Sequence, residues 1–387
     1  MKFSLADVAY LTSADGVAAL AEVAALDVTS DRIAGVAAVR ARFGERAPAL
    51  VETTLLRGRA VVKLPGTADW LFTDEALQQA TAMPVAEHRA ARLAGMRVHD
   101  ATCSIGTELA ALRAHATTTV GSDIDPVRLA MARHNLGTSA YLCRADALHP
   151  ITRDTVVLVD PARRSAGRRR FDPRAYLPPL DDLAEVYAGR DLVVKCAPGI
   201  DFDAMRTLGF GGEISVTSLA GSVREACLWP AALTPPGVTR RAVILDRAEE
   251  LTDADPDDAT VAAAGRWIVD PDGAVVRAGL VRQYATRHGL WQLDPDIAYL
   301  SGDRLPEGVR GFEVVEELAF SEKRLRAALT ARDCGAVEIL VRGVGVDPDV
   351  LRQRLRLRGT VSLSVVITRL GTGSASRAVA FICHPSR

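Results

Sequence analysis

Four aspartates between residues 98 and 164 have the spacing expected of a ligand-binding site. Asp100, Asp123, Asp146 and Asp160 each follow a short apolar or β-branched run, and helix-like stretches follow the first two. This alternation is typical of parallel strands in a doubly wound α/β sheet, where ligand groups gather at the carboxyl ends of the strands. Carboxylates there accept hydrogen bonds from hydroxyl and amino groups. The spacing therefore predicts a binding site built from several strand ends.

The first of these carboxylates begins a turn with a single glycine, Asp100-Ala101-Thr102-Cys103-Ser104-Ile105-Gly106. Together with the order of the later aspartates, this turn resembles the class I S-adenosylmethionine-dependent methyltransferases, whose first strand ends in D-x-G-x-G-x-G. Asp100 and Gly106 hold the outer positions of that pattern. Thr102, Ser104 and Ile105 depart from the usual small residues. Because Thr and Ser still permit close backbone approach, we expect the loop to be kept.

The resemblance implies a Rossmann-like, doubly wound sheet with S-adenosylmethionine bound at its carboxyl edge. It places Asp123 on the ribose hydroxyls and Asp146 near the adenine amino group. The cofactor contacts that it implies come from the residues Asp100, Thr102, Cys103, Ser104, Gly106, Thr107, Asp123, Ile124, Asp146 and Ala147.

A nicotinamide-binding Rossmann unit is the rival interpretation of the same stretch. It also has a glycine turn and an acid about twenty residues further on that binds ribose. That unit needs three glycines in G-x-G-x-x-G, and here only Gly106 is present. It also gives no role to Asp100 or to Asp160-Pro161. The sequence therefore favours a methyltransferase.

The motif Asp160-Pro161-Ala162-Arg163 occupies the catalytic position of the resemblance. Methyltransferases of amino groups use [DNS]-P-P-[FYW] there, so Ala replaces the second proline and Arg replaces the aromatic residue. We expect Asp160 to accept a hydrogen bond from an acceptor N–H and to orient it for in-line transfer. Arg163 is the second catalytic candidate, as a stacking or phosphate-holding group. The departure from the pattern leaves the acceptor atom open.

A covalent mechanism is the alternative. RNA uridine-C5 methyltransferases pair D-P-P-R with a nucleophilic cysteine in C-N-P, and this chain has Cys196-Ala197-Pro198 after the next strand. Attack by Cys196 requires a lowered thiol pKa, which Lys195 can provide only from the same side of the strand. Adjacent strand residues face opposite sides. Direct transfer is therefore the preferred mechanism.

An arginine-rich run leaves the carboxyl end of the strand that precedes Asp160. It contains six arginines within twelve positions and one aromatic residue, Phe171. Guanidinium groups bind phosphate bidentately and stack on bases, so this run predicts contact with RNA. A solvated loop is the alternative. The expected substrate-binding residues are Arg164, Arg168, Arg169, Arg170, Phe171 and Lys195.

The layout of the chain predicts three parts: an N-terminal helical region (1–75), a methyltransferase domain (76–235) and a C-terminal α+β domain (240–387). The segments Leu77-Gln78-Gln79-Ala80-Thr81 and Val341-Arg342-Gly343, with the arginines at 352, 354, 356 and 358, resemble bacterial methyltransferases that carry a THUMP-like C-terminal domain. That resemblance implies RNA modification. A small-molecule or protein methyltransferase and a non-catalytic RNA-binding protein are the alternatives.

Composition sets the remaining expectations. A net charge of −1 gives no overall attraction to nucleic acid, so RNA binding must depend on local patches. No apolar run approaches the roughly 18–20 residues of a membrane helix, and no signal peptide is expected. The six cysteines form neither C-x-x-C nor a zinc-like cluster, which predicts a cytoplasmic protein with reduced thiols and no metal. The sequence does not indicate an oligomeric state.

Overall fold

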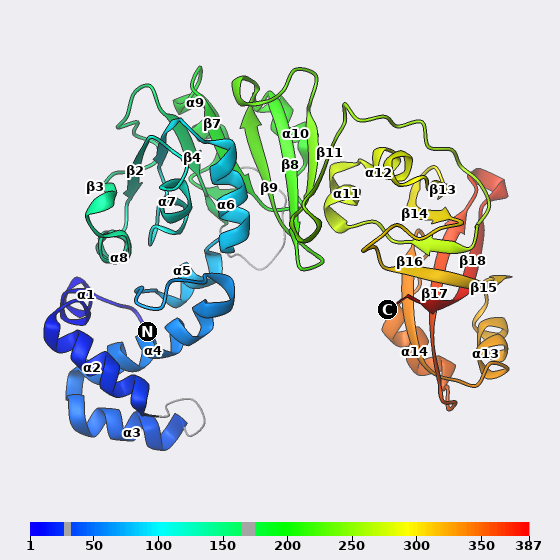
Figure 1. The fold of residues 1–387 in the computed structure, drawn as a ribbon, viewed down its shortest axis with the longest axis horizontal. Helices are drawn as coiled ribbons and strands as arrows, with labels where there is room; N and C mark the ends of the chain where they lie inside the picture. Colours follow the sequence, from blue (N-terminus) through cyan, green and yellow to red (C-terminus); the bar gives the residue numbers. More distant parts are fainter. Residues whose placement is uncertain (27–31, 164–174, 387) are drawn as a thin grey trace. The chain divides into compact units, whose positions relative to one another are not determined.

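The computed structural model describes residues 1–26, 32–163 and 175–386 (Figure 1). Their packing divides the chain into two compact units. The first unit contains Met1–Ile214 and Arg224–Pro235, and the second contains Ser215–Val223 and Pro236–Arg387. The division passes through the hairpin formed by the strands β8 (Gly212–Leu219) and β9 (Ser222–Pro230).

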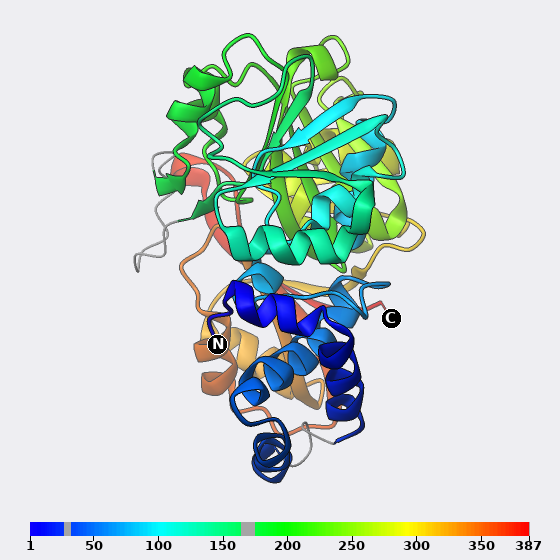
Figure 2. The same cartoon turned by 90° about the vertical axis from the view of Figure 1, so that its left-hand side faces the viewer.

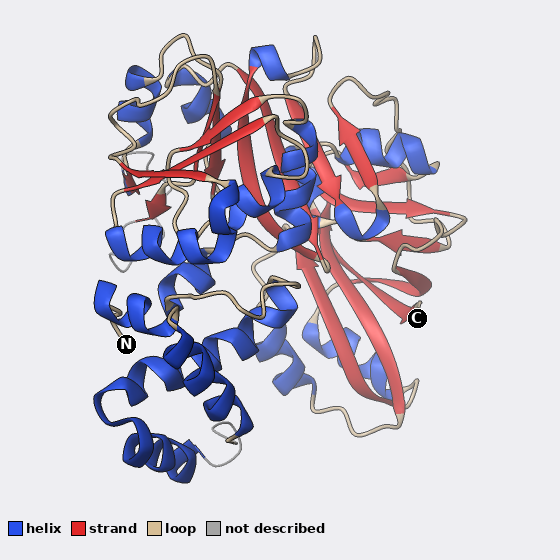
Figure 3. Ribbon diagram, turned by 60° about the vertical axis from the view of Figure 1, so that its left-hand side comes forward, coloured by secondary structure: helices blue, strands red, loops and turns tan. Residues whose placement is uncertain are grey.

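The first unit begins with helices, as predicted. They are α1 (Leu5–Leu11), α2 (Ala14–Ala25), α3 (Arg32–Phe43) and α4 (Ala47–Lys63), coloured blue in Figure 3. Ser4 and Asp7 form a capping box at the start of α1, and the Ser13 hydroxyl caps α2. Such caps satisfy N–H groups that have no partner within the helix. Within the described ranges, no single helix is long and apolar enough to cross a membrane, and α1 with α2 meets the criterion only as a pair bent by 77°.

A mainly parallel sheet follows, which confirms the predicted fold class. Within the first unit the strand order is β9-β7-β4-β1-β2-β3, where β9 is antiparallel to β7 and the other neighbours are parallel. The new strands are β1 (Arg97–Asp100), β2 (Thr118–Asp123), β3 (Tyr141–Arg144), β4 (Val156–Val159) and β7 (Leu192–Cys196). Every residue of β4 and β7 is buried, as expected for the inner strands of a parallel sheet with both faces covered.

Helices connect these strands. They are α7 (Thr107–Leu112) after β1, α8 (Pro126–Leu136) after β2 and α9 (Leu180–Val186) before β7. The sequence Asp125-Pro126 predicts an N-cap followed by a proline in the first turn of a helix. The structure confirms this for α8, where the Asp125 carboxylate accepts the N–H groups of Val127 and Arg128. Figure 2 shows α1, in dark blue, packed against α8, in teal. The helical region and the sheet therefore belong to one packed unit.

Two short helices lead into β1. They are α5 (Asp74–Gln79) and α6 (Met83–Arg92). From the sequence, Thr73 is expected to cap a helix that begins at Asp74. This is confirmed in α5, where the Thr73 hydroxyl accepts the Ala76 N–H at 3.0 Å. Acidic residues in the first turn, Asp74 and Glu75, also favour a helix start here.

The second unit has its own seven-stranded sheet, in the order β13-β14-β12-β15-β18-β17-β16. The strands are β12 (Trp267–Val269), β13 (Trp291–Asp294), β14 (Ile297–Gly302), β15 (Gly311–Ala319), β16 (Cys334–Arg342), β17 (Val361–Leu370) and β18 (Arg377–Pro385). Along β17, Val365 packs in the core under the helices α13 (Glu322–Thr330) and α14 (Pro348–Leu355), while Val366 packs in the core of the opposite face. This alternation confirms the predicted α+β module.

Two sequence predictions in the second unit are wrong. In the sequence, Asp270-Pro271-Asp272-Gly273 predicts a hairpin turn between two strands. Instead, the Asp272 carboxylate accepts the Ala274 N–H and caps the helix α11 (Gly273–Ala278). The acidic stretch 249–258, which the sequence predicts to be an exposed loop, is not wholly a loop. Its first residues form β11 (Glu249–Thr252), which pairs with β10 (Arg240–Ile244), and β10 in turn pairs with β8. A third expectation from the sequence, that the β8–β9 hairpin forms the edge of its sheet, is also wrong, because β10 and β11 lie beyond it.

Candidate active site

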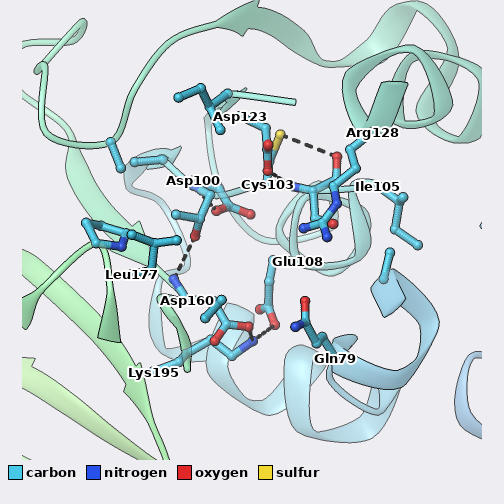
Figure 4. A pocket seen from close by; sticks show the side chains of 18 of the residues that line it. Gln79, Asp100, Cys103, Ile105, Glu108, Asp123, Arg128, Asp160, Leu177 and Lys195 are labelled. Carbon is cyan, nitrogen blue, oxygen red and sulfur yellow. Dashed lines mark hydrogen bonds and ion pairs between the residues drawn. The ribbon is translucent and has the colours of Figure 1, made fainter. Parts of the chain in front are cut away.

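A cavity of about 340 Å³ lies at the carboxyl ends of β1, β2, β3 and β4. The four aspartates singled out from the sequence all line it, and so do most of the expected cofactor contacts. Figure 4 shows Asp100, Asp123 and Asp160 around the cavity. The predicted residues in its wall are Asp100, Thr102, Cys103, Ser104, Thr107, Asp123, Ile124, Asp146, Ala147, Asp160 and Lys195. Gly106 belongs to the same loop without being part of the described lining.

The loop between β1 and α7 has two residues in the left-handed region, Ser104 (φ 48°) and Gly106 (φ 92°). A Cβ at Gly106 would lie 2.7 Å from Leu136 Cδ1, so a larger residue would clash as well as strain the backbone. Ser104 carries a Cβ in this region, which costs about 1–2 kcal/mol. Its N–H donates to Asp123 Oδ2 at 2.9 Å, and the Cys103 N–H donates to the Ser122 carbonyl at 2.9 Å. The end of β2 thus holds the loop.

Asp100 is a buried carboxyl, and one of its two oxygens has no hydrogen-bond partner among the described residues. Its Oδ1 accepts the Thr102 N–H at 3.1 Å, whereas Oδ2 has no partner among the described residues. Burial raises the pKa of Asp100 well above its usual range, and Glu108 raises it further. The Thr107 hydroxyl, also in the cavity wall, is likewise buried and without a partner in the described part of the chain. Both groups fit a ligand that brings its own polar atoms, because buried polar groups are ordinarily satisfied.

Asp123 combines a structural contact with an open position in the cavity wall. Its Oδ1 accepts the Asp125 N–H at 2.9 Å, in addition to the Ser104 contact at Oδ2. Burial raises the pKa of Asp123, and these two backbone N–H groups oppose that rise. Each carboxylate oxygen has two lone pairs, so both can accept a further hydrogen bond. The neighbouring Ile124 is 61% exposed, an apolar surface at the cavity wall.

A buried chain of alternating charges leads from the cavity into the sheet. Lys195 Nζ lies 2.5 Å from Asp160 Oδ2 and 3.0 Å from Glu108 Oε1. Arg89 contacts both oxygens of Glu108, at 2.9 and 3.2 Å, and also pairs with Glu225. Burial alone would lower the pKa of Lys195, but Asp160 and Glu108 outweigh it and raise the pKa above its ordinary value. Burial would likewise raise the pKa of Glu108, yet Arg89 and Lys195 hold it below the usual range.

Lys195 has a different environment from that of a substrate-binding lysine. Besides its two carboxylate partners, its ammonium donates to the Thr81 hydroxyl at 2.5 Å. Three acceptors match the three donors of an ammonium group. The side chain is also buried, only 6% exposed. Lys195 lines the cavity, and its ammonium group there contacts the carboxylate of Asp160 (Figure 4).

Cys196 lies beside Lys195 on β7 but is not among the described residues that line the cavity. It is buried, and its side chain contacts the Val194 carbonyl. The alternation of side chains along a strand explains the difference, because Lys195 is directed to the cavity and its neighbour to the other face.

The arginine-rich run falls mostly outside the described residues. The predicted substrate-binding residues that lie outside the described part of the chain are Arg164, Arg168, Arg169, Arg170 and Phe171. The backbone of Arg163 is described. It belongs to β5 (Ala162–Arg163), which pairs with β6 (Tyr176–Leu177) directly after the Asp160 motif.

Several cavity residues were not predicted from the sequence. Pairing of β5 with β6 brings Leu177, Pro178 and Pro179 to the wall beside Asp160 and Ala162. No local pattern marks this segment, since its position follows from a two-residue strand pairing across the arginine-rich run.

Glu108 and the end of α5 also line the cavity. Glu108 has the sequence context of an ordinary first-turn acid, and only the packing of α6 against α7 shows that it meets Arg89. Gln79 and Arg89 precede the first strand, and the resemblance makes both candidates for ligand contact. Gln79 lines the cavity, whereas Arg89 belongs to the buried charge chain. Thr81 belongs to the segment 77–81, which carries part of the family resemblance, and it also lines the cavity. No group of three or more His, Cys, Asp or Glu that could hold a metal ion occurs in the described ranges.

Comparison with known proteins defines the class to which this fold and site belong. The chain is 68% identical over 358 residues to proteins of two Mycobacterium tuberculosis strains that are named as uncharacterized S-adenosylmethionine-dependent methyltransferases. The match spans 90% of this chain and 100% of each relative. The chain therefore belongs to the S-adenosylmethionine-dependent methyltransferases, and S-adenosylmethionine is its cofactor.

Further similarities concern the parts of the chain. Residues 309–385 match the family model of a THUMP domain-like region, and residues 4–60 match a domain of unknown function, DUF8688. The crystal structure of a Porphyromonas gingivalis W83 protein assigned as a methyltransferase is 19% identical and covers 100% of both chains with a TM-score of 0.74. At that identity the likeness concerns the fold. It shows that a fold of this kind recurs in another protein.

Proposed function

We propose that this methyltransferase modifies a nucleotide of structured RNA, such as tRNA or rRNA, by direct in-line transfer. The observation that carries the proposal is the position of Asp160. It ends β4 in the wall of the cavity with a side chain about 40% exposed, while Lys195 fixes one of its oxygens. A fixed and accessible carboxylate is suited to accept a hydrogen bond from the N–H of an acceptor base. This contact would hold the lone pair of the base in line with the methyl group to be transferred.

The cofactor residues proposed from the sequence fit this placement. Asp100 Oδ2 and the Thr107 hydroxyl are buried polar atoms without described partners, which suits the charged methionine end of the cofactor. Asp123 is proposed to bind the ribose, with Ile124 against the adenine ring and Asp146 near its amino group. Bound S-adenosylmethionine supplies an electrophilic methyl group on a sulfonium. The protein's part is to orient both partners and to keep Asp160 in place.

The acceptor side of the cavity is proposed to consist of Ala162 and the segment Leu177-Pro178-Pro179. These residues line the cavity beside Asp160, and Leu177 is 54% exposed. This apolar surface can contact a base at the position where the related motifs have an aromatic residue. Arg163 follows Ala162 directly and is proposed as a second catalytic residue.

RNA as the substrate is supported by the THUMP-like match in the second unit. The arginines of α14 are weaker support, because Arg352 pairs with Asp349 and Arg354 pairs with Glu322. The arginine-rich run 163–174 is proposed as the main phosphate contact. A covalent route through Cys196 gains no support from a thiol outside the described cavity wall. We further propose a cytoplasmic location, where the reduced thiols expected from the sequence would be kept.

Mass spectrometry of nucleosides tests the proposal. RNA from a strain lacking this gene should miss one methylated nucleoside that returns with the wild-type gene and not with Asp160→Ala. An unchanged set of RNA nucleosides in the deletion strain would refute an RNA substrate and leave a small-molecule or protein acceptor.

A further inference from the structure

Ile105 of the cofactor loop belongs to the hydrophobic core of the N-terminal helices. It is 2% exposed and clusters with Leu11 of α1, Leu50 of α4 and Met131 of α8. The residue lies between the strained Ser104 and Gly106, the two left-handed positions of the loop. The helices that match a domain of unknown function are therefore packed onto the loop at its most constrained point.

Asn135 of α8 makes a second link between the same two parts. Its Oδ1 accepts the Leu71 N–H at 2.8 Å, and its Nδ2 donates to the Leu71 carbonyl at 3.1 Å. The same Nδ2 donates to the Ile105 carbonyl at 3.0 Å. One side chain thus joins the backbone that follows the N-terminal helices to the backbone of the cofactor loop. Asn135 is not among the described residues of the cavity wall, so it would act on a ligand only through the loop.

The loop is held from two sides with different origins. On the sheet side, Ser122 and Asp123 accept the N–H groups of Cys103 and Ser104. On the helix side, Ile105 is held by its buried side chain and by the Asn135 contact. A loop that contains a non-glycine residue at φ 48° keeps that conformation only where its surroundings enforce it.

We propose that the N-terminal helical region is a positioning element for the cofactor loop, acting through Ile105 and Asn135. Docking of α1–α4 holds the loop in the shape that receives the cofactor. Cofactor binding and helix docking are then coupled, and the coupling is reciprocal because both bias the same loop. This inference rests on the proposed placement of the cofactor against the loop.

The first experiment compares two variants of neighbouring residues on α8. Asn135→Ala removes the link to Leu71 and Ile105, and we expect it to weaken S-adenosylhomocysteine binding about fivefold or more in calorimetry, given about 1 kcal/mol per hydrogen bond. His134→Ala is the matched control. It removes an exposed contact of His134 Nε2 with the Asp69 carbonyl, which serves the same segment without touching the loop. We expect the control to bind as the wild type does, and equal affinities in a folded Asn135→Ala would overturn the proposal.

The second experiment uses the wild-type protein and does not depend on a variant that folds. Saturating S-adenosylhomocysteine should slow amide hydrogen exchange in the loop 100–107 and also in α1 and α4, which make no described part of the cavity wall. Slowing in the loop without any in α1 and α4 would overturn the coupling and leave the cofactor placement intact. If the ligand binds but the loop is not protected, the proposed placement itself fails. Loss of the α1 and α4 protection in Asn135→Ala would confirm the route of the coupling.

Discussion

Replacing Lys195 by methionine tests whether this residue organises the catalytic carboxylate. The substitution keeps an unbranched side chain that is one heavy atom shorter, and it removes the charge and the three donors. Lys195 is 5% exposed and lies between Asp160 and Glu108, so its loss breaks two ion pairs at once. We expect a less stable first unit and an Asp160 that no longer has a fixed orientation.

The magnitude follows from the burial of the two partners. Removing one partner of a buried ion pair costs about 3–5 kcal/mol, because the other charge is left uncompensated. Glu108 keeps Arg89, at 2.9 Å, which favours the lower end of that range. Asp160 is 40% exposed and can be hydrated, so its lost contact contributes at most about 1 kcal/mol. We therefore expect Lys195→Met to lower the free energy of unfolding by about 3 kcal/mol.

Scanning calorimetry measures this loss as a lower Tm of the first unit. A change of about 3 kcal/mol corresponds to about 6–12 °C for a unit of this size. Lys63→Met is the matched control, since Lys63 is a partly buried lysine that caps α5 by donating to the carbonyls of Leu77 and Gln78. We expect the control to lose only about 1 kcal/mol, because no carboxylate is left unpaired. A Lys195→Met protein as stable as the Lys63→Met protein would refute the charge chain.

The pH dependence gives the same prediction a sign. The pKa of Lys195 is raised, so its contribution is complete below the ordinary lysine value and is lost as the pH rises through the raised value. The pKa of Glu108 is lowered, so its contribution is complete above the ordinary glutamate value and is lost as the pH falls through the lowered value. Both contributions are complete between about pH 5 and pH 10, so neither Lys195 nor Glu108 should itself make the difference between wild type and Lys195→Met depend on pH in that range.

Three further predictions concern the cofactor and the RNA. Asp123→Ala should weaken S-adenosylhomocysteine binding at least tenfold in calorimetry, since it removes ribose hydrogen bonds worth about 1.5–3 kcal/mol each, and unchanged affinity in a folded variant would contradict the cofactor placement. Asp100→Asn should stabilise the free protein by about 1–3 kcal/mol at pH 8, because the raised pKa of Asp100 means that burying its charge costs stability as the pH rises, and urea unfolding should show the gain shrinking toward pH 4. Replacing Arg168, Arg169 and Arg170 with Ala should reduce RNA affinity and the salt dependence of binding, which is about −0.7 per phosphate for single strands, and equal slopes in fluorescence anisotropy would make this run a solvated loop.

The order of strand-end carboxylates is the part of the site that the sequence determines most directly. Asp100, Asp123, Asp146 and Asp160 follow apolar runs, and parallel pairing brings the ends of such runs to one edge. Helix caps were predictable for the same reason, because Thr73 bonds an N–H three positions along the chain. Local chemistry decides these features, so a single sequence contains enough information.

Features that depend on distant contacts could not be derived in the same way. Glu108 pairs with Arg89, 19 positions away, and Arg89 also pairs with Glu225, 136 positions away. Nothing in the sequence around Glu108 separates a buried ion-pair partner from a solvated helix residue. The prediction of a hairpin at Asp272 was wrong for a local reason. The sequence Asp-Pro-Asp-Gly suits both a hairpin turn and a helix start, and the packing of the second unit selects the helix.

Methyl transfer to RNA by purified protein tests the central claim most directly. Labelled S-adenosylmethionine is incubated with total RNA from the deletion strain and with wild type, Asp160→Asn or Asp160→Ala in single turnover. The wild type should label the RNA, Asp160→Asn should retain part of that rate because an amide oxygen still accepts a hydrogen bond, and Asp160→Ala should lose it while still binding S-adenosylhomocysteine. A wild-type rate in Asp160→Ala, or RNA that stays unlabelled by the wild type, would contradict this account.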